Sequence, residues 1–176
     1  MKKVVMVALL SSIVTAPAVA SDLYAGLSLG QSSYSFGSLS NNDQLSVAIL
    51  GGYNINEIFA AEIEYSDFGS IDYLPSVFKG NAIGISAIGS LYPTEKISIF
   101  GKVGVASSSL EETHPNGLAA HNMNHKNAGM TFGFGAQYNV DPKLGFRASF
   151  DSYPIGDNLS GTGLVYAMSV GGIFKY

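Results

Sequence analysis

Gly129-Met130-Thr131-Phe132-Gly133-Phe134-Gly135-Ala136-Gln137-Tyr138 is the clearest run of alternating side chains in this 176-residue sequence. Large or apolar residues occupy every second position, and glycine, threonine or glutamine fills the positions between them. Successive side chains of a β-strand point to opposite faces, so a period of two predicts a strand with one apolar face and one small or polar face.

The same alternation recurs in seven further segments, which cover residues 23–30, 45–53, 59–66, 83–91, 97–105, 144–151 and 163–176. Such segments suit the roughly 9 to 11 residues of a tilted membrane strand. Their connections alternate in length. Four-residue turns are expected at 54–57, 93–96 and 140–143, and longer polar loops at about 31–43, 68–79, 107–127 and 153–161. Short turns on one side and long loops on the other are typical of outer-membrane barrels, whose short side is periplasmic. We therefore expect an all-β fold, an eight-stranded antiparallel up-and-down transmembrane β-barrel with both termini in the periplasm.

The composition excludes several other classes of protein. Only 12% of the residues are charged, about half the usual share of a soluble domain. No stretch after residue 20 approaches the roughly 20 apolar residues of a membrane helix. The absence of cysteine excludes a disulfide scaffold and a thiolate metal site. The net charge of −4, with no basic stripe, argues against nucleic-acid binding.

The first twenty residues have the features of a signal peptide. Lys2 and Lys3 precede an apolar run, and Ala18-Val19-Ala20 supplies the small-residue pattern that signal peptidase recognises. We expect residues 1–20 to be removed and residues 21–176 to form the barrel. An uncleaved membrane anchor is the alternative, but serines and Pro17 interrupt its apolar core.

A soluble β-sandwich or lipocalin-like barrel would show the same alternation with its apolar faces turned inward. Its other face would then carry lysine, glutamate and threonine, whereas here that face is mostly glycine, serine and alanine. Small residues suit the narrow lumen of an eight-stranded barrel. Tyr53 and Tyr138 precede short turns, where an interfacial aromatic girdle belongs. Tyr92 does not fit, because strict alternation turns it inward unless a bulge lies near Gly89.

Several segments resemble the OmpA-like transmembrane domain and its small single-domain OmpX-like relatives. The similarity runs from Leu23-Tyr24-Ala25-Gly26 through Gly51-Gly52-Tyr53-Asn54 and Phe100-Gly101-Lys102-Val103-Gly104 to the last residue. The closing segment Ser169-Val170-Gly171-Gly172-Ile173-Phe174-Lys175-Tyr176 is similar to the signal read by the barrel assembly machinery. The residues of that signal are Ser169, Gly171, Phe174 and Tyr176. The chain stops at the barrel, so we expect no peptidoglycan-binding domain.

Alternation turns four charged residues toward the lumen: Glu62, Glu64, Lys102 and Arg147, the last being the only arginine. A lone buried charge costs several kcal/mol, so these residues should pair with one another. The resemblance implies a polar plug of this kind, and we expect Glu62 or Glu64 to pair with Arg147. The cluster is either a static salt-bridge core or a gate that exchanges partners.

The three histidines, His114, His121 and His125, fall in the third long loop beside Glu111 and Glu112. Imidazoles and carboxylates can bind zinc or nickel, but the spacing fits no standard motif. We predict no metal, no cofactor and no enzymatic activity.

The resemblance implies a structural or surface-interaction role, through envelope integrity, adhesion or partner binding by extracellular loops. The alternative is a narrow ion-conducting pore. The expected partners are outer-membrane lipid, the assembly machinery and a host or surface ligand, and the barrel is expected to be a monomer.

Overall fold

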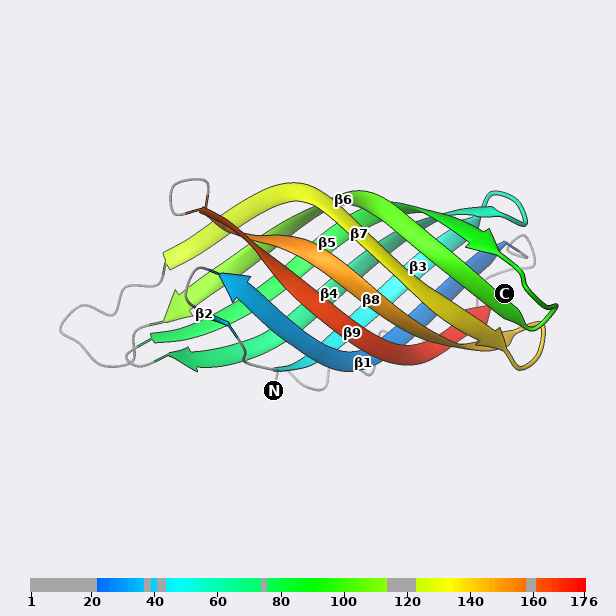
Figure 1. Cartoon of the computed structure of the whole chain (residues 1–176), viewed down its shortest axis with the longest axis horizontal. Coiled ribbons are helices and arrows are strands. Elements are labelled where there is room, and N and C mark those ends of the chain that lie inside the picture. Colours follow the sequence, from blue (N-terminus) through cyan, green and yellow to red (C-terminus); the bar gives the residue numbers. More distant parts are fainter. Residues whose placement is uncertain (1–21, 37–38, 41–43, 74–75, 114–122, 158–160) are drawn as a thin grey trace.

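The computed structural model describes residues 22–36, 39–40, 44–73, 76–113, 123–157 and 161–176. It contains a single antiparallel sheet, in which β1 also pairs with β9 so that the sheet closes into a barrel (Figure 1). The strands are β1 (Leu23–Phe36), β2 (Leu39–Ser40), β3 (Gln44–Asn54), β4 (Phe59–Tyr73), β5 (Ser76–Leu91), β6 (Ile97–Thr113), β7 (Met123–Asn139), β8 (Leu144–Asp157) and β9 (Gly161–Lys175). Because β2 is only a two-residue extension paired with the end of β1, eight long strands form the wall. The predicted fold class is confirmed. The described part of the chain has no helix that is both long and apolar enough to cross a membrane.

One end of the barrel, the turn end, carries three short connections at residues 55–58, 92–96 and 140–143. Each is closed by a polar side chain near its centre. Asn56 Oδ1 accepts from the Phe59 amide at 2.7 Å, Thr94 Oγ1 from the Ile97 amide at 3.1 Å, and Asp141 Oδ1 from the Leu144 amide at 2.8 Å. Such side-chain acceptors are typical of tight turns. The C-terminus lies at this end, on the right of Figure 1, and the opposite end is the loop end.

The strands run further toward the loop end than the sequence pattern predicts. Residues 31–36, 39–40, 68–73, 76–79, 107–113, 123–127 and 153–157 lie in strands, where the sequence pattern predicts loops. Both faces of these extensions are polar or mixed, as in Ser107-Ser108-Ser109 of β6. The alternation of hydrophobic residues therefore fades there, while backbone pairing continues from Ile83↔Ser107 to Val77↔Thr113.

No bulge lies near Gly89 to reconcile Tyr92 with strict alternation. Pairing of β5 with β6 continues without a break to Leu91↔Ile99, and Tyr92 simply leaves the strand, with 53% of its surface exposed. The register shift lies instead between Asp67 and Ser70 of β4. Gly69 has a φ of 74° there, a backbone conformation that glycine adopts without steric cost.

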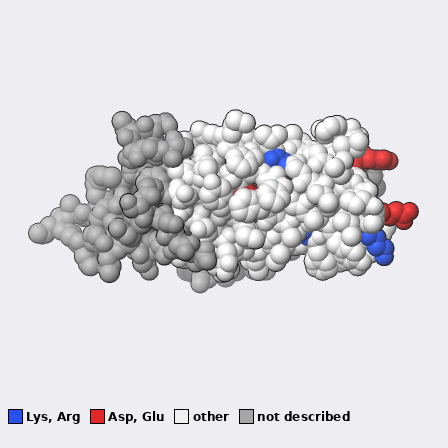
Figure 2. Space-filling model, viewed as in Figure 1, with Lys and Arg blue, Asp and Glu red and all other residues white. Residues whose placement is uncertain are grey.

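The outward face of the wall is apolar below the loop-end extensions of the strands. Large exposed side chains include Ile49, Ile63, Ile85, Val105, Phe132, Phe134, Phe146 and Val170. Figure 2 shows that the side of the barrel carries few charged atoms, while lysine and carboxylate groups gather at the turn end. So large an exposed apolar surface is not stable in water and fits a hydrocarbon environment.

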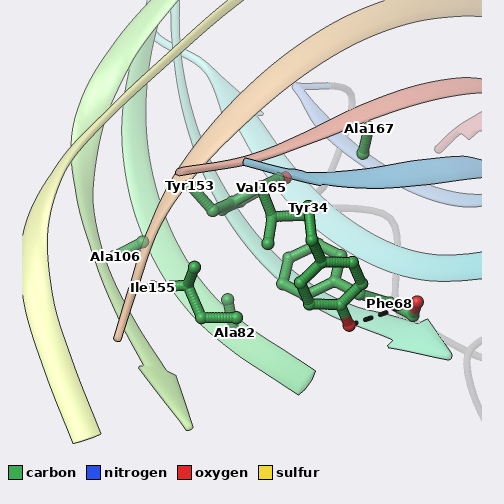
Figure 3. Packing of buried hydrophobic residues seen from close by; sticks show 8 residues of the cluster. All are labelled: Tyr34, Phe68, Ala82, Ala106, Tyr153, Ile155, Val165 and Ala167. Atoms are coloured by element: carbon green, nitrogen blue, oxygen red, sulfur yellow. Dashed lines mark hydrogen bonds between the residues drawn. The ribbon is translucent and has the colours of Figure 1, made fainter. Parts of the chain in front are cut away.

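The lumen contains two apolar layers. The loop-end layer (Figure 3) consists of Tyr34, Phe68, Ala82, Ala106, Tyr153, Ile155, Val165 and Ala167. The turn-end layer consists of Tyr24, Ala60, Ile88, Phe100 and Ile173, with Leu50 packed against it. Side chains thus occupy much of the lumen, as expected of a barrel with eight strands.

Candidate functional site

A cluster of charged side chains lies in the lumen between the two apolar layers. It draws on alternate strands: β4 supplies Glu62 and Glu64, β6 supplies Lys102, and β8 supplies Arg147. Positions 62 and 64 share a face because side chains of a strand repeat every second residue. The structure therefore brings together the four charged residues that alternation directs inward.

Lys102 is at the centre of the cluster and is surrounded by carboxylates. Its Nζ lies 2.9 Å from Asp151 Oδ1, 3.0 Å from Glu64 Oε2 and 3.8 Å from Glu62 Oε1. Only 5% of its side chain is exposed. A buried ammonium group is stable only when opposite charges surround it in this way.

Arg147 pairs with Glu62, one of the two partners that the sequence suggested. Its Nη1 lies 2.6 Å from Glu62 Oε2, and its Nε donates to Gln137 Oε1 at 3.1 Å. The guanidinium carbon sits 4.8 Å from the centre of the Phe100 ring and 5.5 Å from that of Tyr24. Cation–π contacts with these turn-end aromatics fix the plane of the guanidinium. Glu64 is bound to Lys102 instead.

Three members of the cluster were missed by the sequence analysis. Asp151 ion-pairs with Lys102, and two tyrosine hydroxyls donate to the glutamates, Tyr24 to Glu62 Oε2 at 3.0 Å and Tyr153 to Glu64 Oε1. Alternation along β8 already placed Asp151 on the inward face with Arg147, so its omission was avoidable. The tyrosine bonds join strands far apart in sequence, and no local pattern predicts them.

Water has little access to the centre of this cluster. The cavity beside Glu64, Lys102 and Arg147 measures about 10 Å³, about the space for one water molecule. A larger vestibule of about 350 Å³ opens at the turn end and reaches inward as far as Phe100 and Arg147. The charged groups at the centre of the cluster form ion pairs with one another, and two of their carboxylate oxygens, Glu62 Oε1 and Asp151 Oδ1, have no hydrogen-bond partner among the described residues.

The remaining predicted residues lie elsewhere. His114 and His121 fall outside the described residues, and His125 lies in β7 opposite Leu110. Within the described ranges, no three metal-ligating side chains come together.

The predicted assembly residues lie in and after β9. Ser169 Oγ lies 3.1 Å from Ser149 Oγ, Gly171 pairs with Ser28 of β1, and Phe174 is exposed on the outer wall. The Tyr176 amide donates to the Leu23 carbonyl at 3.0 Å, so the last residue takes part in the closure of the barrel.

A closed antiparallel barrel with an apolar outer wall and a polar, filled lumen defines a transmembrane β-barrel of the outer-membrane type. The family model described as outer membrane protein beta-barrel domain matches residues 6–172, and the chain belongs to this family. It is an outer-membrane β-barrel of the kind found in Gram-negative bacteria. The sequence matches none of the curated proteins.

Solved structures share the fold at low sequence identity. Neisserial surface protein A is 20% identical with a TM-score of 0.75, over 89% of this chain and 99% of that one. Ail of Yersinia pestis, crystallised with the heparin analogue sucrose octasulfate, is 14% identical with a TM-score of 0.62, over 88% and 99%. The N-terminal barrel of Pseudomonas aeruginosa OprF is 16% identical with a TM-score of 0.56, over 86% and 97%. At this identity, the likeness concerns the fold.

Proposed function

We propose that this protein is a plugged outer-membrane scaffold with a structural or surface-interaction role, exerted through the loop end of the barrel. The observation that carries this proposal is the order of layers in the lumen. The Lys102 and Arg147 cluster lies between two apolar layers, and the cavity within it holds about 10 Å³. No step of this role requires catalysis or a cofactor.

The alternative, a narrow ion-conducting pore, would require this cluster to rearrange. An ion entering from the turn-end vestibule meets Phe100 and Arg147 at its floor. To pass further it would have to separate Arg147 from Glu62 and Lys102 from its three carboxylates. Breaking a buried pair leaves uncompensated charge in a medium of low dielectric, which is strongly unfavourable. The geometry therefore favours the static plug, and planar-bilayer conductance separates the two functions.

For the orientation, we propose that the turn end and both termini face the periplasm and the loop end faces outward, as in barrels with this asymmetry of connections. Single cysteines at two exposed lysines test this, since the chain has no cysteine of its own. A membrane-impermeant maleimide added to intact cells should label Lys126→Cys and leave Lys143→Cys unlabelled until the cells are lysed. Labelling of Lys143→Cys alone in intact cells would reverse the orientation.

We propose that a loop-end partner is cationic or neutral and is not a sulfated polysaccharide. Ail binds a heparin analogue in its crystal, but this chain has few cations at the corresponding end. In and beside the loop-end connections, the sequence has two lysines, Lys79 and Lys126, against six acidic residues, Asp43, Asp67, Asp72, Glu111, Glu112 and Asp157. Like charges across an interface suppress association.

The test uses immobilised heparin and immobilised polylysine with the purified barrel in detergent. The protein should pass through heparin and be retained on polylysine, with retention lost as salt rises. Grafting the four loop-end connections onto an unrelated eight-stranded barrel should transfer this behaviour. Retention on heparin, or retention that stays with the strands after grafting, would overturn the proposal.

We also propose that Ser169, Gly171, Phe174 and Tyr176 form the assembly signal and that the barrel is a monomer. β9 is the last strand in the sequence and pairs with β1 over Tyr24–Ser35, so it presents an open edge before the barrel closes. Once the barrel is closed, each of the eight long strands pairs with a neighbour on both sides over most of its length, which leaves little edge for another copy.

A further inference from the structure

The loop-end half of β8 departs from the alternation that governs the rest of the wall. Five consecutive residues, 151–155, are buried. Alternation places Ser152 and Pro154 on the outward face, where their side chains would contact lipid. Burial of both faces indicates that β8 leaves the wall along this stretch.

The pairing of β8 with β7 stops at the same point. The β7–β8 ladder ends at Phe132↔Ser152, whereas β8 stays paired with β9 as far as Asp157↔Gly161. On its other side, β7 remains paired with β6 as far as Glu112↔Met123. The β8 tip, defined here as Tyr153–Asp157, is therefore no longer paired with β7 but is still paired with β9.

The β8 tip lies beneath β7, on the lumen side. A Cβ atom at Gly129 of β7 would lie only 3.2 Å from Pro154 Cβ. The tip reaches past β7 to β6, where the Ser108 hydroxyl donates to the Pro154 carbonyl. Tyr153 and Ile155 then fill the loop-end apolar layer, as Figure 3 shows.

Side-chain hydroxyls replace the backbone donors that β7 would otherwise supply. Thr131 Oγ1 of β7 donates to the Ser152 carbonyl at 2.6 Å, and the Ser108 hydroxyl of β6 donates to the Pro154 carbonyl. Pro154 has no amide hydrogen to give to a ladder. Two buried polar atoms near this seam, Asn127 Nδ2 and Ser152 Oγ, have no hydrogen-bond partner among the described residues. The tucked position therefore leaves hydrogen-bonding capacity unused, which raises its free energy.

We propose that the β8 tip is a lid with two positions. In the tucked position it closes the loop-end apolar layer. In the second position the tip swings outward with β9, the β7–β8 ladder continues beyond Phe132↔Ser152, and the apolar layer opens toward the loop end. The charged cluster below does not move. This property goes beyond the proposed scaffold role, which requires only a fixed barrel.

The test measures the access of water to the two apolar layers separately. Ala106→Cys reports on the loop-end layer and Ala60→Cys on the turn-end layer, and both alanines are buried. The rate of modification by a small water-soluble methanethiosulfonate is compared in the parent barrel and in Ser108→Ala/Thr131→Val, which lacks both hydroxyl bonds. Loss of two hydrogen bonds should raise the rate at Ala106→Cys by about tenfold or more and leave that at Ala60→Cys unchanged.

Gly129→Ala provides a second route to the same displacement, because its methyl group would press on Pro154. It should also raise the rate of modification at Ala106→Cys. If the double variant does not fold, Gly129→Ala is used for the test in its place. Folding of each variant is checked by the difference in gel mobility between unheated and boiled samples. An unchanged rate at Ala106→Cys in the folded variants would overturn the lid, and so would an equal rise at both positions, which would indicate general loosening.

Discussion

Arg147 on β8 and Glu62 on β4 meet across the lumen, with Nη1 2.6 Å from Oε2 and with only 12% and 1% of their side chains exposed. The two strands lie four positions apart around a barrel of eight long strands, so they are on opposite walls. This ion pair therefore joins the two sides of the barrel directly. Gln137 accepts from the guanidinium, the rings of Phe100 and Tyr24 lie against it, and the Tyr24 hydroxyl donates to Glu62.

Arg147→Ala should destabilise the folded barrel by about 3–5 kcal/mol, because it removes the closest cation from the buried Glu62 carboxylate. Unfolding by urea or guanidinium in lipid vesicles measures the change. Lys79→Ala is the matched control, since the Lys79–Asp67 pair is at 3.5 Å with half of the lysine exposed, and such pairs contribute about 0–1 kcal/mol. Equal effects of the two substitutions would contradict a structural role for the buried pair.

Lys102→Ala should be at least as damaging as Arg147→Ala, since it leaves three carboxylates facing one another. A second change, Lys102→Ala/Asp151→Asn, removes one of these negative charges and should recover about 1 kcal/mol or more. The free energies of unfolding of the two single variants and the double variant form a cycle that isolates this coupling. Strict additivity of the two changes would show that Asp151 does not belong to the cluster.

Two neighbouring glycines of β6 should respond differently to the same substitution. A Cβ at Gly104 would overlap the carbonyl oxygen of Ile85 on β5, whereas a Cβ at Gly101 meets no atom within 4 Å. Gly104→Ala should therefore cost about 1–3 kcal/mol, and Gly101→Ala should be neutral or stabilising by up to about 1 kcal/mol. The two denaturation midpoints are compared directly. A cost at Gly101 as large as that at Gly104 would refute the steric explanation.

The cost of a charge on the outer wall should depend on its depth in the apolar band. Val105 lies at the middle of β6 with its side chain exposed, so Val105→Lys should cost about 2–4 kcal/mol in a bilayer. Leu91, at the turn end of β5, is also exposed, but Leu91→Lys should cost only about 0–1 kcal/mol because it lies near the membrane interface. Similar costs at both depths would mean that the apolar band does not coincide with the hydrocarbon core.

The C-terminal residues should matter for assembly more than for stability. Phe174→Ala/Tyr176→Ala should reduce the amount of barrel inserted in cells, while the purified variant should refold in detergent almost as well as the parent. Val170→Ala, on the same outward face of β9, is the control that leaves the terminal pattern intact. Normal insertion of the terminal variant would remove the assembly role from these residues.

Alternation predicted the barrel, its eight long strands and the inward side of Glu62, Glu64, Lys102 and Arg147, because in-out patterning is imposed on every residue of a membrane strand. It failed where that constraint ends. Beyond the apolar band, polar residues such as Ser107 and Ser109 extend the strands without any periodic signal. The tuck of Ser152 and Pro154 depends on contacts with β6 and β7, which lie elsewhere in the sequence.

The sequence pattern also does not predict which glutamate pairs with which cation in the cluster. Glu62 and Glu64 occupy equivalent positions in the pattern, yet one pairs with Arg147 and the other with Lys102. That choice follows from the stagger of β4 relative to β6 and β8 around the barrel. Pairing registers of this kind are properties of the closed sheet and are not encoded in any single strand.

Planar-bilayer conductance of the purified, refolded protein tests the plugged lumen most directly. Insertion is verified by the shift in gel mobility on heating, and an open porin in the same bilayer serves as a positive control. The ion pairs of Lys102 and Arg147 predict that the inserted barrel adds no steady conductance above the bare membrane. A reproducible ohmic conductance that scales with the amount of inserted protein would contradict the plug and identify the protein as a pore.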